Sequence, residues 1–277
     1  MKKILLLVLF GLFVFISGCK YVKNEKLASM EEVVEEGLAF SVKQSLLMAK
    51  SLEDMESRLP KTIDENGKLV SCSPSWWTSG FFPGTLWYLY EHSNDPKLKD
   101  WAVNYTLRVE EQKHNTRHHD VGFMIFNSFG HAFRITGNTK YKDVIKTASR
   151  SLITRFDPDV GCIQSWNSRK KWPYPVIIDN MMNLEILMWS SKKFDRPKFK
   201  NVAVSHADKT MKHHFRDDYS SYHVVSYDTL TGEPEKKQTH QGYSDESAWA
   251  RGQAWGLYGY TMMYRETGKA EYLEQAQ

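Results

Sequence analysis

Two aspartates, Asp120 and Asp179, have the sequence surroundings of a pair of chemically active carboxylates. Asp120 follows two histidines, Asp179 follows two isoleucines, and each is flanked by apolar sequence where a solvent-facing residue is not expected. A helix N-terminus lowers the pKa of a carboxyl, whereas burial and a second carboxylate raise it. One of the two could therefore hold a proton near neutral pH and serve as general acid. Taken alone, either residue is equally well explained as a helix cap.

Flat aromatic side chains suggest a carbohydrate as the ligand of these carboxylates. Aromatic residues make up 13% of the chain, and their faces suit the C–H surfaces of sugars, although core packing also explains any single tryptophan. The residues considered are Trp76, Trp77, Trp166, Trp172, Tyr174, Trp249 and Trp255. Arg251, His119 and His223 could meet an anionic group, since Arg binds a carboxylate through two hydrogen bonds. Three other histidines are interpreted as surface or packing residues: His118, His213 and His214.

Four helical hairpins are expected to position these side chains. A largely apolar helix, a short turn and an amphipathic helix recur at 81–109, 121–156, 178–215 and from 248 to the end of the sequence. The turns at 136–138 and 267–269 are alike enough to count as an internal repeat. Such hairpins stack with the apolar helices inside, which predicts an all-α fold, an α/α barrel or solenoid. The segments that precede the inner helices then meet on one face: 76–80, 118–120, 177–180 and 241–245.

The remaining segments complete this outline. One helix is expected over 29–57, ended by Pro60, and the last inner helix is expected to begin at the polar pair Ser244 and Asp245. Its Arg251 and Gln253 indicate either an internal hydrogen-bond network or a polar ligand at the mouth of the barrel. Two long connections, 157–176 and 217–241, are expected at the same end, and the second has the pattern of a small β-hairpin. This outline gives nine helices, whereas a closed ring of six hairpins needs three more. We therefore expect the sequence to be a fragment of a longer protein rather than a complete chain that folds as an open arc of hairpins.

The N-terminus predicts export to a bacterial cell envelope. Lys2 and Lys3 precede an apolar run over 4–16, which is too short to span a bilayer, and small residues lead to Cys19. This pattern indicates a lipoprotein signal over 1–19, lipidation of Cys19, a tether over 20–28 and one domain over 29–277. The anchored domain is expected to face the periplasm, with the lipid as its only membrane contact. The alternative is an ordinary secretory signal.

Composition excludes some other classes of partner. The formal net charge is only +4 and no Lys/Arg-rich run occurs, so a nucleic-acid partner is not expected. Cys72 and Cys162 could pair in an oxidising compartment, but two cysteines do not make a disulfide framework and we expect no bridge. No metal-binding motif occurs, so neither a metal nor an organic cofactor is expected.

Four segments in order resemble the unsaturated glucuronyl hydrolases of glycoside hydrolase family 88: WWTSGFFPGTLWYLYE (76–91), HHDVGFM (118–124), IIDNMMNLEIL (177–187) and QGYSDESAWARGQAWGLYGY (241–260). The resemblance runs from about Met30 onward. It implies an (α/α)6 barrel that acts on oligosaccharides left by polysaccharide lyases. Such enzymes hydrate the vinyl ether of a C4=C5 unsaturated uronic acid at the non-reducing end, and the hemiketal then opens and releases the sugar.

The resemblance also implies a role for each matching residue. Asp179 would be the general acid/base that protonates C4 and helps water to add at C5, and Asp120 would position the substrate and tune Asp179. The residues that would hold the sugar and its carboxylate are His119, His223, Gln241 and Arg251, with Trp77, Trp166 and Trp255 around the ring. Such a step needs only a proton and water.

Two alternatives remain at this point. The unsaturated rhamnogalacturonyl hydrolases of family 105 resemble family 88 in fold and reaction, although the segment ARGQAW (250–255) favours the glucuronyl hydrolases. A non-catalytic lipoprotein that binds oligosaccharides would keep the tryptophans but have no use for Asp179.

Overall fold

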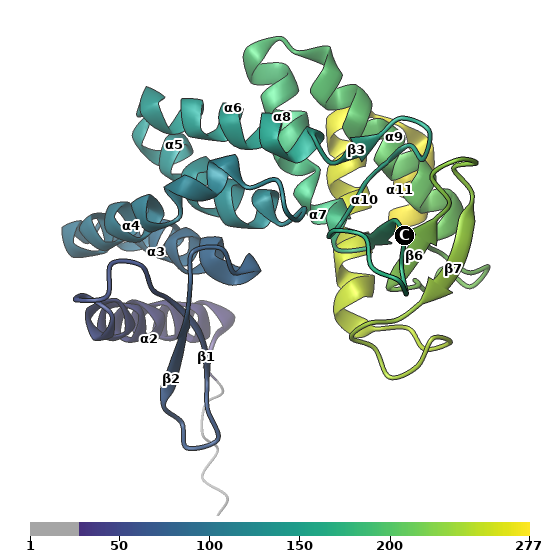
Figure 1. Cartoon of the computed structure of the whole chain (residues 1–277). Coiled ribbons are helices and arrows are strands. Elements are labelled where there is room, and N and C mark those ends of the chain that lie inside the picture. The colour runs from purple at the N-terminus through teal and green to yellow at the C-terminus, as the bar shows by residue number, and fades with distance from the viewer. Residues whose placement is uncertain (1–27) are drawn as a thin grey trace, which may run out of the picture. The chain divides into compact units, whose positions relative to one another are not determined.

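Helices form most of the protein in the computed structural model, which describes residues 28–277 (Figure 1). Internal contacts divide the chain into two units, Met1–Ser41 and Val42–Gln277. Helix α2 (Met30–Ser51) crosses this boundary, and all other described elements belong to the second unit. No helix of the described residues is both long and apolar enough to cross a bilayer. The expected signal peptide and Cys19 lie outside the described residues.

The four predicted helical hairpins are confirmed. Their inner segments are α3 (Phe81–Ser93), the π-helix η3 (Gly122–Gly130) with α5 (His131–Thr136), α7 (Asn180–Asn183) with α8 (Glu185–Phe194), and α10 (Ala250–Thr267). Their outer helices are α4 (Pro96–Arg108), α6 (Thr139–Ile153), α9 (Pro197–His213) and α11 (Ala270–Ala276). Two short 3₁₀ helices, η1 (Trp77–Gly80) and η2 (Glu110–His114), precede α3 and follow α4. Together with α2, the described chain thus contains the opening helix and four hairpins that the sequence predicts.

The internal repeat reflects one way of ending an inner helix. In α5 the Thr136 hydroxyl donates to the Ala132 carbonyl and accepts from the Asn138 N–H, while Gly137 adopts φ +67°. In α10, Thr267 makes the same two contacts, with the Met263 carbonyl and the Lys269 N–H, and Gly268 adopts φ +72°. Glycine suits this left-handed conformation because it has no Cβ. Each turn therefore sends the chain back into an outer helix.

Glycines also allow the N-terminal ends of the inner helices to approach closely. A Cβ on Gly80, just before α3, would lie 2.2 Å from the carbonyl oxygen of Met124 in η3. A Cβ on Gly122, at the start of η3, would lie 2.6 Å from the side-chain oxygen of Asn183 in α7. That Asn183 oxygen accepts from the backbone N–H of Phe123 at 2.8 Å. These contacts bring together the helix ends that carry Asp120 and Asp179.

Two helix boundaries differ from the prediction. Helix α2 ends at Ser51 rather than near Ser57, and the guanidinium of Arg108 binds carbonyls of the following turn, those of Leu52, Met55 and Arg58. Helix α10 begins at Ala250 rather than at the expected cap of Ser244 and Asp245. The Asp245 carboxylate instead accepts from the Thr239 N–H and the Gln238 amide. It therefore stabilises the loop before α10 and is not available as a helix cap.

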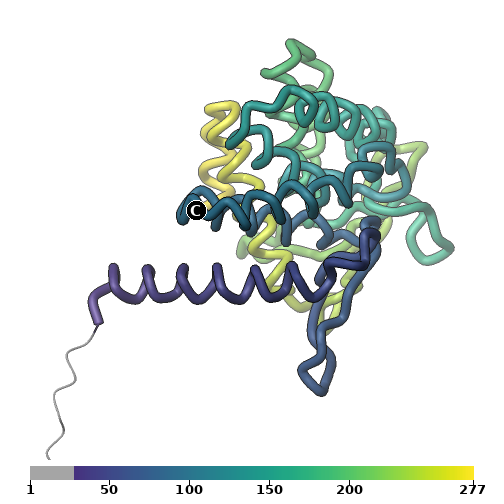
Figure 2. Tube along the Cα trace, turned by 90° about the vertical axis from the view of Figure 1, so that its left-hand side faces the viewer, coloured from purple at the N-terminus to yellow at the C-terminus, as the bar shows by residue number. Residues whose placement is uncertain are grey.

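Three small antiparallel sheets accompany the helices. The predicted hairpin is present as β6 (Val224–Tyr227) and β7 (Pro234–Gln238), and β5 (Pro175–Ile177) pairs with β6, so the two long connections form one sheet. The strand pair β1 (Leu59–Ile63) and β2 (Leu69–Cys72) was not predicted, and it projects from the neighbouring helices in both views (Figures 1 and 2). The third sheet pairs β3 (Phe156–Asp157) with β4 (Cys162–Ile163). Cys72 and Cys162 are buried free thiols.

Candidate active site

A pocket of about 750 Å³ lies where the inner helices begin. Seven of the nine predicted site residues line it: Trp77, His119, Asp120, Trp166, Asp179, Gln241 and Arg251. The other two lie behind its wall: the His223 ring nitrogen Nε2 is 3.7 Å from the Asp179 carboxylate, and the Trp255 ring packs against Phe123 with centroids 5.2 Å apart. Segments far apart in the sequence thus converge on one concave site, which is the arrangement expected of a ligand site.

The carboxyl of Asp179 is buried at the pocket and has a raised pKa. Its exposed fraction is only 7%, and it stands directly before α7 without capping that helix. Burial raises the pKa of Asp179 to about 7; its own backbone N–H lowers it, the charge of Asp120 raises it, and Arg251 and the Trp255 indole lower it. A carboxyl with this pKa holds a proton for part of the time at neutral pH, so it can act as a general acid.

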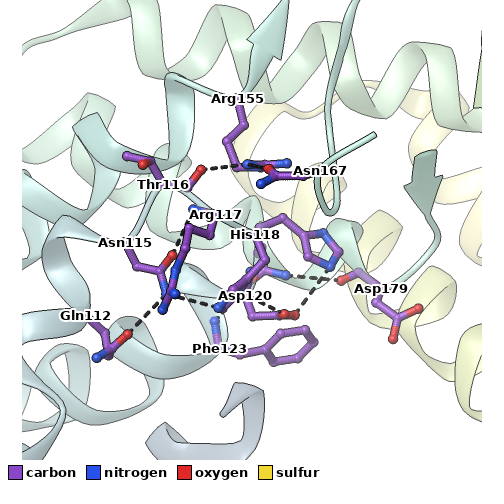
Figure 3. Close-up of polar contacts among 12 residues, drawn as sticks. Gln112, Asn115, Thr116, Arg117, His118, Asp120, Phe123, Arg155, Asn167 and Asp179 are labelled. Atoms are coloured by element: carbon purple, nitrogen blue, oxygen red, sulfur yellow. Dashed lines mark hydrogen bonds and ion pairs between the residues drawn. The ribbon is translucent and has the colours of Figure 1, made fainter. Parts of the chain in front are cut away.

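Asp120, in contrast, is kept charged by two histidines, and Figure 3 shows its contact with one of them, His118. The His118 atom Nδ1 lies 3.1 Å from Asp120 Oδ2, and the His119 atom Nε2 lies 3.3 Å from Oδ1. Burial raises the pKa of Asp120, but His119, His118 and Arg155 together hold it below the usual value. Burial also lowers the pKa of His119 to about 4. The site therefore combines a charged carboxylate, Asp120, with a carboxyl that can carry a proton, Asp179.

The ring of His223 has a fixed orientation beside Asp179. Its Nδ1 accepts from two backbone N–H groups, those of His240 at 2.9 Å and Gln241 at 3.1 Å. Burial lowers the pKa of His223 to about 3, so the ring is neutral and its proton must be on Nε2, the atom nearest Asp179. The loop after β7 thereby sets the tautomer of a hydrogen-bond donor at the site.

Arg251 supplies a cation to the lining of the pocket. Its guanidinium donates to the side-chain oxygen of Gln241, and its carbon lies 4.3 Å from the Trp249 ring centroid and 5.6 Å from that of Trp77. These contacts orient a planar donor group that suits a carboxylate. The side-chain oxygen of Gln253 instead accepts from the Ser221 N–H, and its nitrogen donates to the Tyr219 carbonyl. Near the start of α10, Arg251 therefore lines the pocket, whereas Gln253 belongs to an internal hydrogen-bond network.

Several buried polar atoms around the site have no hydrogen-bond partner within the described residues. They are Thr78 Oγ1, His119 Nδ1, Trp166 Nε1, Asp179 Oδ2, His223 Nε2 and Trp255 Nε1. Leaving such an atom unpaired costs about 1–3 kcal/mol, and native proteins leave few of them. A polar ligand rich in hydroxyl groups could satisfy these atoms, and aromatic rings beside them suit its apolar faces.

Arg155 connects two of the segments that form the pocket. Its guanidinium donates to the Thr116 carbonyl at 2.6 Å and to the Asn167 side chain at 3.2 Å (Figure 3). It also donates to the Gln164 carbonyl at 2.7 Å. A further backbone bond runs from the His119 N–H to the Ser165 carbonyl. The segment of Asp120 and the segment of Trp166 are therefore fixed to each other.

Other predictions about individual side chains had mixed outcomes. Trp172 is 3% exposed and its indole N–H donates to Gln238, so it serves packing behind Trp166. His213 and His214 are buried packing residues, as predicted. The same interpretation was wrong for His118, which touches Asp120. Its position beside His119 in the sequence was the available signal.

Several pocket residues were not predicted as site residues from the sequence. They are Lys61 and Thr62 in β1, Ser75 before η1, Ser165 and Arg169 in the first long connection, Ile177 in β5, and His240 after β7. Arg169 and His240 stand in or beside segments that had been singled out, whereas the strand pair that carries Lys61 gave no signal. Among the described residues there is no group of three or more His, Cys, Asp or Glu side chains arranged for a metal ion.

Most of the chain matches one known protein family. The model of Glycosyl Hydrolase Family 88 matches residues 48–276. The chain belongs to this family. Family 88 relatives include an unsaturated glucuronyl hydrolase of Formosa agariphila, 46% identical over 224 residues, and an unsaturated chondroitin disaccharide hydrolase of Streptococcus agalactiae, 36% identical over 247 residues. These matches cover 80% and 88% of this chain but only 56% and 61% of the relatives' own length.

Solved family 88 structures share the fold. A heparin-specific unsaturated glucuronyl hydrolase matches with a TM-score of 0.81 and 44% identity over 87% of this chain and 66% of its own. The enzyme from Bacillus sp. GL1 matches with a TM-score of 0.79 and 32% identity, over 86% of this chain and 65% of its own. The stacked hairpins described here are thus those of the family's α/α barrel.

Proposed function

We propose that the protein removes the C4=C5 unsaturated uronic acid from the non-reducing end of lyase-generated oligosaccharides of the glycosaminoglycan type. The observation that carries this proposal is the pair of unlike carboxyls, a buried Asp179 with a pKa of about 7 beside an Asp120 whose pKa is held low. The names of the family 88 relatives, which include glucuronyl and chondroitin disaccharide hydrolases, support the same substrate class.

The reaction needs one proton donor and one water. Protonated Asp179 gives its proton to C4, which leaves positive charge shared between C5 and the ring oxygen. Water then adds to C5 and returns a proton to Asp179, so the carboxyl is regenerated and a hemiketal forms. The hemiketal opens and releases the neighbouring sugar. Asp120 orients the sugar, the Nε2–H of His223 faces Asp179 from behind the pocket wall, and Arg251 binds the uronate carboxylate.

Ultraviolet absorbance tests the reaction directly, because hydration destroys the conjugated C=C–carboxylate chromophore. The purified chain mixed with an unsaturated glucuronyl disaccharide is expected to give a steady fall in absorbance, and a slower fall with an unsaturated rhamnogalacturonyl disaccharide. A faster reaction with the pectin fragment would instead support a family 105 type of specificity. No fall with either sugar, from a protein that melts cooperatively, would count against activity of this chain.

The pH dependence of the same assay identifies the acid. Only protonated Asp179 can donate to C4, and the pKa of this carboxyl is about 7. The rate constant kcat/KM should therefore be constant at mildly acid pH and fall about tenfold for each further pH unit above that pKa. A rate that rises with pH through neutrality would show that Asp179 is required as a base in the free enzyme.

We also propose that the protein is exported and anchored to the bacterial cell envelope through a lipid on Cys19, with its domain facing the periplasm. The support is the sequence alone, namely the basic start, the apolar run over 4–16 and the small residues before Cys19. Growth of expressing bacteria with radioactive palmitate should label the wild-type protein and not Cys19→Ala. Equal labelling of both proteins would argue against this anchor.

A further inference from the structure

Four polar side chains form a line that ends at Asp120 (Figure 3). The amide nitrogen of Asn115 donates to Gln112 Oε1 at 3.1 Å and contacts His118 Nε2 at 3.0 Å. On the other side of the same ring, His118 Nδ1 lies 3.1 Å from Asp120 Oδ2. Asn115 is 8% exposed, so this line is largely shielded from solvent. The function proposed above gives no role to Asn115 or His118.

A backbone N–H determines which atoms of this line carry hydrogen. The N–H of Arg117 can only donate, and it points at one side-chain atom of Asn115 at 2.9 Å, which must therefore be the oxygen. The other atom of the amide is then the nitrogen, and it donates to His118 Nε2. A ring nitrogen that accepts carries no proton, so the proton of His118 is on Nδ1 and faces Asp120.

One other contact of the ring favours the opposite tautomer and has to be weighed against this assignment. The backbone nitrogen of Asp120 lies 3.3 Å from His118 Nδ1, and a hydrogen bond there would need a bare Nδ1 and a proton on Nε2. That Nε2–H would point at the Asn115 N–H, and two donors would face each other at 3.0 Å. With the proton on Nδ1, the Asp120 N–H faces it at the longer distance of 3.3 Å, but Nδ1–H donates to the charged Oδ2 at 3.1 Å and Nε2 accepts from Asn115. This tautomer therefore satisfies more of the contacts of the ring.

We propose that Asn115 and His118 are positioning residues that act through Asp120. Asn115 sets the tautomer of His118, and His118 then donates to Asp120 Oδ2 while His119 faces Oδ1. Asp120 is thereby kept as an oriented, charged carboxylate beside Asp179. This inference rests on the proposed function for its effect on turnover, but its geometry concerns only the residues of this line.

The other charged groups around Asp120 fit this role. From its own segment it meets His118 and His119, from the end of α6 it meets Arg155, and from the start of α7 it meets Asp179. The hydrogen bond from His118 is one of the effects that lower the pKa of Asp120, and the charge of Asp120 in turn helps to raise the pKa of Asp179. A tautomer set at Asn115 can thus influence the protonation of the general acid.

Two substitutions of His118 separate a positioning role from mere packing. The side-chain amide of Asn can offer an N–H where the histidine has Nδ1–H, whereas Leu fills space without a donor. His118→Leu is expected to lower kcat by about tenfold, the value of one hydrogen bond to a charged group. Without this hydrogen bond the pKa of Asp120 rises, so the loss of kcat/KM at acid pH, where Asp120 takes up a proton, should begin at a higher pH than in the wild type. His118→Asn should show a much smaller loss of kcat and a much smaller shift in the pH dependence. The exposed histidine of the same segment provides a control, since His114→Leu should change neither.

Nuclear magnetic resonance of the ¹⁵N-labelled histidine rings tests the tautomer without any assay of turnover. The signals of His118 are those missing in His118→Asn, and in the wild type they should show a protonated Nδ1 and a bare Nε2. Asn115→Asp replaces the donor by an acceptor and should put a proton on Nε2. A wild-type ring with its proton on Nε2 would overturn the inference, and so would His118→Asn and His118→Leu of equal activity. Absence of turnover with the expected tautomer would count against the proposed function alone.

Discussion

Asp179→Asn is expected to lower the rate of hydration about 10³-fold while the protein still binds the unsaturated sugar. The amide has nearly the shape of the carboxyl, so the packing around this 7% exposed side chain should survive. It cannot give a proton to C4, however, and general acid catalysis typically contributes between about 10² and 10⁴ in rate. The ultraviolet assay gives the rate, and quenching of tryptophan fluorescence by the sugar gives the affinity, because Trp77 and Trp166 line the pocket.

A second aspartate supplies the control for this substitution. Asp208 accepts a hydrogen bond from the Tyr272 hydroxyl at 2.5 Å and pairs with Lys269, and none of these residues lines the pocket. Asp208→Asn should therefore change stability slightly and leave the rate unchanged. If Asp179→Asn hydrates the sugar as fast as Asp208→Asn does, Asp179 is not the acid. If it has lost both binding and its cooperative melt, the substitution has damaged the fold and the rate says nothing about acid catalysis.

Arg155→Met is expected to lower the free energy of unfolding by about 3 kcal/mol, because several hydrogen bonds to a charged group are lost and their buried acceptors are left without a donor. Arg155 is 9% exposed and binds the carbonyl oxygens of Thr116 and Gln164. Methionine keeps much of the aliphatic length but offers no N–H. Urea denaturation measures the loss of stability. Because the two joined segments carry Asp120 and Trp166, kcat/KM of the folded protein should fall as well.

Arg108 is a matched control for Arg155. Its guanidinium also binds several backbone carbonyls, those of Leu52, Met55 and Arg58, each within 3.0 Å, but the turn that it holds contributes no residue to the pocket. Arg108→Met should lower stability by a similar amount and leave kcat/KM of the folded protein unchanged. Equal losses of kcat/KM in both variants would mean that the effect of Arg155 is a general consequence of loosened structure and not of the joined pocket segments.

The helices could be predicted because their signals are local. Apolar periodicity, the capping residues Asp95 and Asn138, and the turn glycines Gly137 and Gly268 lie within or beside the segments that they define. From the order of hairpins it followed that the starts of the inner helices share one face. That step alone brought Asp120 and Asp179 together, and the structure confirms that both line one pocket.

The strands and several contacts could not be predicted because their causes are distant in the sequence. Pairing of β5 with β6 joins Val176 to Val225, residues with no local sign of each other. Asp245 had the sequence signature of a helix cap, yet the nearby strand end at Gln238 and Thr239 offered it better donors. The role of His118 depends on Asn115 and on the tautomer of its ring, which no spacing of residue types reveals.

The strand pair β1–β2 makes one wall of the pocket independent of the helices that carry the carboxyls. Lys61 and Thr62 reach the pocket from β1, while Arg58 holds the base of the pair through the side chain and carbonyl of Ser71. Glu65 and Asn66 in the turn of this pair are exposed, and a substitution at such a surface position usually changes stability by no more than about 0.5 kcal/mol. Substitutions in this wall can therefore change the shape of the pocket without disturbing Asp179 and the residues that support it.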